Sequence, residues 1–288
     1  MPSTGITNTP NMKTTLALTT LAVLGLSGLA SAETKITVKG SDTMVILAQK
    51  WAETYMGLHK DTTIQVTGGG TGTGFAALQN NTTDLCNASR PIKKDEVLNC
   101  VKAFKAKPTE YKVALDGLAV YVSSENPVKE LTMAQVADIF LGKTTNWKDV
   151  GGKDAPITLY SRENSSGTYE FFKEHVLSKK DFSANAQTMP GTAAVLQAVA
   201  KDLNGIGYGG AAYGAGAKHL FIKKDEASVG VEPIESTVQS GEYPISRGLF
   251  IYVNPAVDKG GMNAYLKWII SAEGQAVVKD VGYFALPK

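Results

Sequence analysis

Three stretches of small polar residues stand where a predicted strand gives way to a predicted helix. Glycine in such a turn accepts a positive φ angle, which lets backbone N–H groups point outward. The first N–H groups of the helix have no partner inside it and carry partial positive charge. A turn of this kind can bind an anion, although a single one is equally well explained as a tight turn that binds nothing. The three stretches are Gly40-Ser41-Asp42-Thr43, residues 68–72 and residues 161–168.

Two arginines lie in turns of the same type, in Ser89-Arg90 and Ser161-Arg162. Arginine offers a rigid fork of N–H donors that suits phosphate-like oxygens. The alternative for a single arginine is a surface charge in contact with water. Because both arginines follow a predicted strand and stand beside a serine, we expect them to contact a ligand. If the fold brings these turns together, they form a pocket of donors for a small tetrahedral anion.

Asp42 is a candidate for selecting between different tetrahedral anions. A carboxylate in an anion pocket repels its ligand unless the ligand brings a proton to donate. Phosphate carries such a proton near neutral pH and sulfate does not, so an acidic residue would disfavour sulfate. An ordinary helix N-cap explains Asp42 equally well. Asp116, which precedes Gly117, is a weaker candidate for the same role.

The sequence gives little support for catalysis. His59, His175 and His219 are scattered, and we find no nucleophile elbow of the Gly-x-Ser-x-Gly type and no His-Glu-x-x-His motif. The glycines of residues 68–74 lack the Lys-Ser/Thr that a P-loop requires, and residues 72–77 match a dinucleotide fingerprint only loosely. We therefore expect a binding protein without cofactor or metal rather than an enzyme.

The composition is that of a folded, water-soluble chain long enough for two lobes. It has 288 residues, of which 43% are hydrophobic and 19% charged, with a formal net charge of +2. Nucleic-acid binding would call for a basic patch, which this balance does not suggest. We expect no nucleic-acid partner.

Residues 1–32 have the pattern of a secretory signal peptide. Lys13 precedes an apolar run at residues 16–29, and Ala30-Ser31-Ala32 is a small-residue cleavage site. The run is too short for a permanent membrane helix. We expect cleavage after Ala32, a periplasmic mature chain and no membrane insertion of that chain. Met12 is an alternative start.

The two cysteines of the sequence, Cys86 and Cys100, lie in one region. In an oxidising compartment, an isolated pair more often forms a disulfide than a metal site. We therefore expect a disulfide between them, provided that the geometry of the fold allows it.

Strand and helix patterns alternate along the chain, which predicts the α/β class with mostly parallel sheets flanked by helices. Two long β-rich runs, residues 111–122 and 243–253, enclose a second unit. This arrangement predicts a discontinuous lobe one at 33–117 and 246–288, a lobe two at 118–245, and a two-strand hinge. Pockets favour the cleft between such lobes. Residues 262–279 have helical spacing and are expected to form one C-terminal helix.

The sequence resembles the periplasmic phosphate-binding proteins of phosphate ABC transporters. The resemblance rests on an ordered set of short motifs that runs across nearly the whole chain after residue 32. The set comprises Gly40-Ser-Asp-Thr-Met44, Gly69-Gly-Thr-Gly-Thr-Gly74, Asn87-Ala-Ser-Arg-Pro-Ile92, Asp116-Gly-Leu-Ala-Val-Tyr-Val122, Asn146-Trp147, Ser161-Arg162, Ser166-Gly-Thr168, Gly205-Ile-Gly-Tyr208 and Gly282-Tyr283.

The resemblance implies a type II periplasmic-binding-protein fold that closes on one phosphate ion and delivers it to an ABC permease. A monomer is also implied. Other tetrahedral oxyanions (sulfate, molybdate), a secreted phosphatase, and an adhesion or signalling role remain alternatives. Transferred by motif, the ligand contacts are Ser41, Asp42, Thr43, Thr71, Gly72, Ser89, Arg90, Arg162, Ser166, Gly167 and Thr168.

Two positions depart from the pattern of better-known members of this family. Where they have an aspartate that accepts the phosphate proton, this chain has Arg90, so that role passes to Asp42 or is absent. Two residues after the arginine of lobe two, an aspartate often pairs with it, but here that position is Asn164. The neighbouring Glu163 is the candidate substitute.

Overall fold

The long strand β4 (Thr109–Val122) passes from one part of the fold into another. Its residues 109–117 pair antiparallel with β11 (Ser246–Val253), while residues 118–122 pair antiparallel with β8 (Gly205–Gly210). The computed structural model describes residue 5 and residues 33–214, 216–257 and 260–287. The predicted signal peptide therefore lies outside the described residues, apart from residue 5.

The remaining elements alternate as expected. The other strands are β1 (Thr34–Gly40), β2 (Thr62–Thr67), β3 (Leu85–Ala88), β5 (Glu130–Thr132), β6 (Thr158–Arg162), β7 (Gln187–Met189), β9 (Lys218–His219) and β10 (Phe221–Lys223). The α-helices are α1 (Val45–Leu58), α2 (Thr71–Gln79), α3 (Lys94–Phe104), α4 (Met133–Phe140), α5 (Gly167–His175), α6 (Thr192–Lys201), α7 (Glu235–Ser240), α8 (Gly261–Ile269) and α9 (Ala272–Val281). Short 3-10 helices occur at η1 (Asp42–Met44), η2 (Trp147–Val150) and η3 (Ala211–Tyr213).

The two largest of the four hydrophobic clusters among the described residues mark two lobes. The first core gathers apolar side chains from β1, α1, α8 and α9, and includes Trp51 and Trp268. The second gathers side chains from α4, α5 and β8, and includes Trp147 and Phe172. The side chains of Val113 and Ala114 belong to the first core and that of Leu115 to the second, so β4 crosses between them. We call the surroundings of the first core lobe one and those of the second lobe two.

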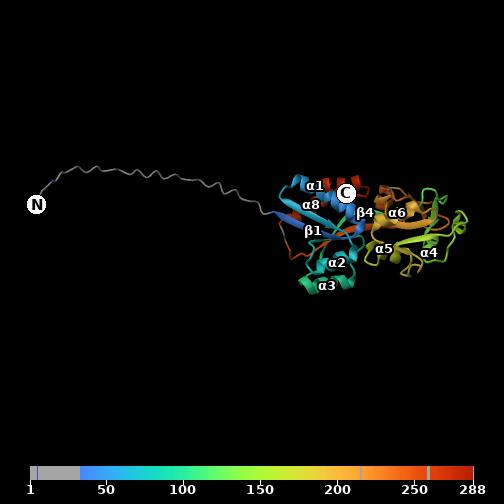
Figure 1. The fold of residues 1–288 in the computed structure, drawn as a ribbon, viewed down its shortest axis with the longest axis horizontal. Coiled ribbons are helices and arrows are strands. Elements are labelled where there is room, and N and C mark those ends of the chain that lie inside the picture. Colours follow the sequence, from blue (N-terminus) through green and yellow to red (C-terminus); the bar gives the residue numbers. More distant parts are fainter. Residues whose placement is uncertain (1–4, 6–32, 215, 258–259, 288) are drawn as a thin grey trace. The chain divides into compact units, whose positions relative to one another are not determined.

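Figure 1 shows α1 and α8 on one side of β1, and α2 and α3 on the other side. The strand order β2-β1-β3-β11-β4-β8-β6-β7 runs from one lobe into the other. Strands β2, β1 and β3 are mutually parallel, and so are β8, β6 and β7. Strands β11 and β4 stand antiparallel in the middle, and the chain crosses between the lobes along β4 and just before β11. The lobe limits at 117/118 and 245/246 remain our proposal.

The C-terminal helix is broken, contrary to the sequence prediction of one helix at 262–279. Helix α8 ends at Ile269 and α9 begins at Ala272. The hydroxyl of Ser271 accepts a hydrogen bond from the Gly274 N–H at 3.4 Å and donates one to the Trp268 carbonyl at 2.7 Å. A serine that bonds the backbone at such a point favours a new helix start over continuation. Apolar spacing alone did not reveal this break.

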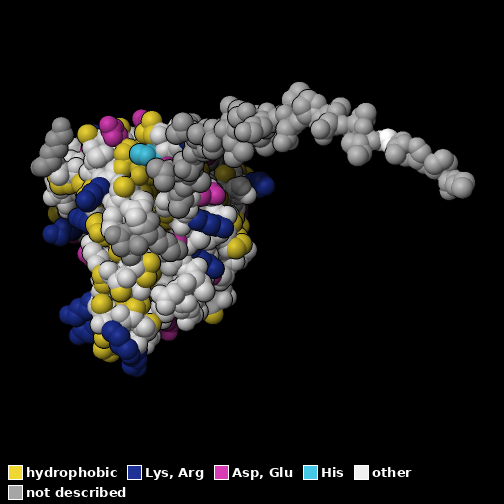
Figure 2. Space-filling model, turned by 90° about the vertical axis from the view of Figure 1, so that its left-hand side faces the viewer, with side chains coloured by type: hydrophobic (Ala, Val, Ile, Leu, Met, Phe, Trp, Pro, Cys, Tyr) yellow, Lys and Arg dark blue, Asp and Glu magenta, His cyan; other side chains and the backbone are white. Residues whose placement is uncertain are grey.

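Surface charge is spread out on the face that Figure 2 shows. Basic side chains stand at separate places there, with apolar and uncharged side chains between them. A continuous basic stripe, which nucleic-acid binding requires, is not seen on this face. Within the described ranges, no helix combines the length and the apolar character needed to cross a membrane.

The expected disulfide is wrong for this structure, in which Cys86 and Cys100 are free thiols. Cys86 lies in β3 among Phe75, Leu78 and Tyr252, and Cys100 lies in α3. Both are fully buried. Burial raises the pKa of the Cys100 thiol to about 11 and that of Cys86 well above its usual value. Both thiols are therefore protonated near neutral pH, and disulfide chemistry requires the thiolate.

We predict that a thiol reagent titrates no cysteine in the folded protein and two in denaturant without reductant. The physical reason is that burial blocks access and suppresses the thiolate. The measurement is a colorimetric thiol count at about pH 8, near the usual cysteine pKa. A count of zero in denaturant would mean that the two cysteines are bridged after all.

Candidate functional site

Three turns of lobe one meet at one edge of its sheet. Because β1, β2 and β3 are parallel neighbours, the turns that follow them share the same edge. Ser41 follows β1, Thr71 begins α2, and Ser89 follows β3. The Ser41 hydroxyl donates to the Ser89 hydroxyl at 2.9 Å, and the Ser89 N–H donates to the Thr71 hydroxyl at 3.2 Å. These three hydroxyl side chains are buried and form one polar cluster.

The turn before α5 in lobe two packs directly on this cluster. Its Ser165 carbonyl accepts a hydrogen bond from the Gly72 N–H at 2.9 Å. Gly70 has φ of 91°, and a Cβ there would lie 2.5 Å from the same carbonyl. A Cβ on Gly167 would lie 2.3 Å from the Thr71 hydroxyl oxygen and 2.8 Å from that of Ser89. Glycines thus allow the two lobes to come into contact here.

The first turn of α5 adds more hydroxyls. Ser166 caps the helix, because its hydroxyl accepts a hydrogen bond from the Tyr169 N–H at 3.2 Å. The Thr168 hydroxyl lies 2.7 Å from that of Thr43, which belongs to lobe one. Thr43 and Thr168 are both buried. The hydroxyl cluster therefore continues across the boundary between the lobes.

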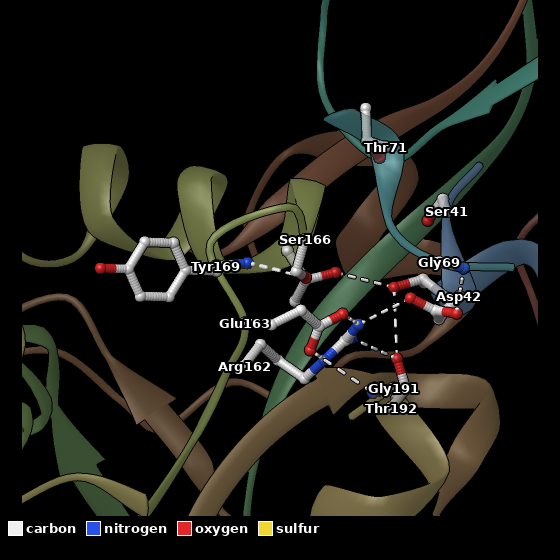
Figure 3. Close-up of polar contacts among 12 residues, drawn as sticks. Ser41, Asp42, Gly69, Thr71, Arg162, Glu163, Ser166, Tyr169, Gly191 and Thr192 are labelled. Carbon is white, nitrogen blue, oxygen red and sulfur yellow. Dashed lines mark hydrogen bonds and ion pairs between the residues drawn. The ribbon is translucent and has the colours of Figure 1, made fainter. Parts of the chain in front are cut away.

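Arg162, the last residue of β6, joins the two lobes electrostatically. Its side chain is 1% exposed, and its Nη2 lies 3.0 Å from the Asp42 carboxylate of lobe one. Nε and Nη2 also donate to the two oxygens of Glu163, at 3.0 and 2.7 Å. Figure 3 shows the guanidinium between the two carboxylates. A buried arginine requires such partners, since an unpaired charge away from water is very unfavourable.

Glu163 takes the part that the family pattern gives to an aspartate at the position of Asn164. Burial by itself raises the pKa of the Glu163 carboxyl, but hydrogen bonds and the charge of Arg162 outweigh it and hold that pKa below its usual value. The Glu163 carboxylate also accepts the Gly191 N–H at 3.4 Å. Glu163 therefore stays ionised and fixes the guanidinium plane.

Asp42 is held on several sides. Its Oδ1 accepts a hydrogen bond from the Gly69 N–H at 2.8 Å, while Oδ2 faces Arg162. The Tyr213 hydroxyl, which comes from η3, donates to the Asp42 carbonyl at 2.7 Å, and Tyr283 donates to the Thr43 carbonyl. Burial raises the pKa of Tyr213 to about 12, so this donor keeps its proton. Ser41 is the N-cap residue of η1 and Met44 that of α1, so Asp42 occupies neither cap position and its carboxylate bonds to Gly69 and Arg162 instead.

Thr192 belongs to the same cluster and was missed from the sequence. Its hydroxyl accepts a hydrogen bond from Arg162 Nη1 at 2.8 Å and lies 3.4 Å from the Thr43 hydroxyl. It begins α6, after Gly191 with φ of 83° and the short strand β7. This is the same strand, glycine and threonine pattern as in lobe one, so the signal was present in residues 187–192.

The Arg90 guanidinium has its hydrogen-bond partners outside the hydroxyl cluster. Its guanidinium makes two hydrogen bonds to the Glu96 carboxylate, at 2.8 and 2.7 Å, and donates to the Pro91 carbonyl at 3.0 Å. It also stacks over Phe75, with 5.5 Å between its Cζ and the ring centroid. Glu96 lies in the first turn of α3, so the Arg90 side chain is committed to its own lobe and we leave it out of the ligand set.

Asp116 also differs from its expected role, because Arg247 neutralises it. Arg247 lies opposite Asp116 in the β4–β11 pairing and donates to one carboxylate oxygen through Nε at 2.9 Å and Nη2 at 2.7 Å. Arg247 Nη1 donates to the Ser89 carbonyl at 3.1 Å. Burial raises the pKa of the Asp116 carboxyl, and Arg247 opposes that shift. The pair thus ties the hinge strands to the third turn of lobe one.

The assembled cluster combines charged and hydroxyl side chains from both lobes. It contains the Arg162 guanidinium, the carboxylates of Asp42 and Glu163 as acceptors, and hydroxyls from both lobes. In the ranges that the structure describes, no group of three or more His, Cys, Asp or Glu side chains is placed to hold a metal ion.

Comparison with known proteins identifies the family of this chain. A model described as a PBP superfamily domain matches residues 27–273. The phosphate-binding protein PstS of Pseudomonas aeruginosa is 39% identical over 264 residues, which cover 86% of this chain and 82% of that protein. The chain belongs to the PBP superfamily and, within it, to the PstS family.

Two further relatives support this membership. The PstS protein of Staphylococcus epidermidis is 38% identical over 259 residues, covering 87% of this chain and 78% of that protein. Among solved structures, one from Clostridium perfringens, named for a phosphate ABC transporter substrate-binding protein with bound phosphate, is similar with a TM-score of 0.79 and 28% identity. It covers 88% of this chain and 100% of its own. The two-lobed fold is thus that of the PstS family.

We predict that Gly167→Ala destabilises the contact between the lobes. The new methyl group would overlap the Thr71 and Ser89 hydroxyls, and overpacking of this kind costs about 1–3 kcal/mol. Urea denaturation and small-angle scattering would measure the loss as lower stability or a larger radius of gyration. Gly57→Ala in α1 is the matched control, because its Cβ meets no atom within 4 Å. Gly167→Ala with unchanged stability and size would contradict the packing.

Proposed function

We propose that this protein captures one inorganic phosphate ion between its two lobes and delivers it to the permease of an ABC transporter. The observation that carries the proposal is the convergence of Arg162 with buried hydroxyls from both lobes around Asp42. A site built from two lobes couples binding to closure. The protein acts as a binding protein and not as an enzyme.

The relatives support phosphate as the ligand. The similar proteins of P. aeruginosa and S. epidermidis carry the name phosphate-binding protein, and the similar C. perfringens structure is named for its bound phosphate. Each of these statements concerns the relative. Their agreement with the donor set of this chain is what supports the assignment.

The proposed contacts are those expected from the sequence, with one removal and one addition. Arg90 is removed because its guanidinium is bonded to Glu96. Thr192 is added because its hydroxyl contacts both Arg162 and Thr43. The set is therefore Ser41, Asp42, Thr43, Thr71, Gly72, Ser89, Arg162, Ser166, Gly167, Thr168 and Thr192. No cofactor or metal is needed for these contacts.

Closure of the two lobes on the ligand is expected because the hydrogen-bond donors come from both lobes. An anion that binds N–H and hydroxyl groups of both lobes has more contacts in the closed state than in the open state. It therefore shifts the population toward closure by its difference in affinity for the two states. A permease that recognises the closed arrangement would then receive loaded protein in preference to empty protein.

Asp42 gives the site a means to distinguish phosphate from sulfate. Its carboxylate has about four acceptor positions, of which Gly69 and Arg162 each occupy one. A phosphate proton can fill another. Sulfate has no proton to donate near neutral pH and would face the carboxylate with an unpaired oxygen.

The cellular location and the oligomeric state are also part of the proposal. The apolar run at residues 16–29, followed by Ala30-Ser31-Ala32, favours export to the periplasm with cleavage after Ala32. There the mature chain would work as a monomer that meets the permease at the membrane surface.

We predict that Arg162→Ala weakens phosphate binding by at least about tenfold, because a charge-assisted bond is lost from a desolvated site. The measurement is calorimetric titration of refolded, phosphate-stripped mature protein at neutral pH. Arg90→Ala is the matched control, since Arg90 is also a buried and ion-paired arginine but bonds within lobe one. It should change phosphate affinity less than Arg162→Ala does.

The same titration separates the alternative functions. Tight one-to-one binding of phosphate with no heat from sulfate supports the proposal. Comparable binding of both would make the protein a general oxyanion carrier, and no heat from either would contradict the anion site. Release of phosphate from a chromogenic ester would instead indicate a secreted phosphatase.

We predict that Asp42→Asn lowers the ratio of phosphate affinity to sulfate affinity by a larger factor than it lowers the phosphate affinity itself. Asparagine keeps the shape of the side chain and adds an N–H donor, which removes the repulsion that sulfate meets. Competition titration of both anions on the variant provides the test. If sulfate remains excluded, another residue accepts the phosphate proton.

A further inference from the structure

An ion pair joins the two lobes outside the proposed phosphate site. Lys93, the residue before α3 in lobe one, has its Nζ 2.6 Å from Oε2 of Glu170 in the first turn of α5 in lobe two. The two side chains are 41% and 32% exposed. Neither residue makes a hydrogen bond to the hydroxyl cluster among the contacts described above. The pair therefore lies at the solvent-facing side of the contact between the lobes.

The residue after Glu170 makes a second contact between the lobes. The ring of Phe171 lies under the Arg247 guanidinium, with 5.5 Å from Cζ to the ring centroid. Both contacts border a cavity of about 530 Å³ that is lined from lobe one by Arg90 and Phe250 and from lobe two by Glu174 and His175. At this cavity, Glu170 and Phe171 of α5 contact lobe one through side chains outside the proposed phosphate site.

We propose that Lys93 and Glu170 form an electrostatic latch that stabilises the closed lobes and slows the release of bound phosphate. The part of this inference that concerns release rests on the function proposed above. The part that concerns closure does not, because the ion pair joins the lobes whatever the ligand is.

The position of the latch explains why it acts on closure. Lys93 belongs to the backbone that follows β3, and its N–H is fixed by the Glu96 carboxylate at 2.8 Å. Glu170 follows the turn whose Ser165 and Gly167 pack on Thr71 and Gly72. If α5 moves away from lobe one, the turn and the ion pair separate together. The attraction between the two charges is therefore present in the closed state and lost in the open state.

Solvent exposure limits the strength of the latch and makes it sensitive to salt concentration. Exposed ion pairs contribute little and are weakened by salt. Reversing one charge replaces the attraction with repulsion, whereas exchanging both charges restores the attraction. The latch should therefore follow the sign of the charges and not the identity of the side chains.

The test is a charge-exchange cycle with Lys93→Glu, Glu170→Lys and the double variant. At low salt, each single reversal should raise the rate constant for release of radiolabelled inorganic phosphate about three- to tenfold, and the double variant should return within about twofold of the parent. High salt should reduce these differences. Lys143→Glu is the matched control, because Lys143 pairs with Asp138 at the same 2.6 Å but wholly within lobe two.

A second measurement needs no phosphate. Spin labels on Lys102→Cys in α3 and Lys180→Cys beyond α5 would report the distance between the lobes in stripped protein, since both positions are exposed and the native cysteines are buried. Each single reversal should increase the fraction of long distances at low salt, and the double variant should restore the parent distribution.

The two measurements separate the failure of the latch from the failure of the proposed function. If the parent protein does not bind phosphate, the proposed function is wrong, and the label distances still decide the latch. If single reversals leave the label distances unchanged, or if the double variant stays as open as the single ones, the latch is wrong even where phosphate binds tightly.

Discussion

The need to neutralise one buried guanidinium governs the centre of this protein. Arg162 is almost fully removed from water, and a charge in that position is tolerated only with close partners of opposite sign. Glu163 supplies one partner from the same lobe and Asp42 supplies the other from the opposite lobe. The contact between the lobes is thus partly electrostatic. A bound oxyanion would enter this balance as a third negative group, which makes a protonated ligand easier to accept than a fully ionised one.

A second buried ion pair supports the first from the hinge. Asp116 and Arg247 stand opposite each other on β4, which crosses between the lobes, and on the neighbouring strand β11. Arg247 also holds the Ser89 carbonyl, which places the hinge in direct contact with a turn of the proposed site. Removing one member of such a pair leaves an unpaired buried charge. The crossing and the site are therefore linked through one arginine.

The proposed site is built from the same strand-to-helix turn, which occurs several times in the fold. Each time a strand ends at a glycine or serine and a helix begins, a group of N–H and hydroxyl donors is exposed at the same edge of the sheet. One such turn binds weakly at best, because its donors also bond to water. Turns from the two lobes pack closely on one another, because Gly70 and Gly167 leave no side chain between them.

The sequence by itself determined the class of the fold, the strand-to-helix turns and nearly all of the clustered hydroxyls, because these depend on local residue types and their period. It also indicated Asp42 and Arg162. Only the tertiary structure decided which partner each charge takes, since Arg90 bonds to Glu96 and Asp116 to Arg247 through the packing of separate elements. The free thiols of Cys86 and Cys100 and the recruitment of Thr192 were settled in the same way. The residue type and its local position determine which bonds a side chain is able to form, whereas the packing of distant elements determines which partner it bonds to.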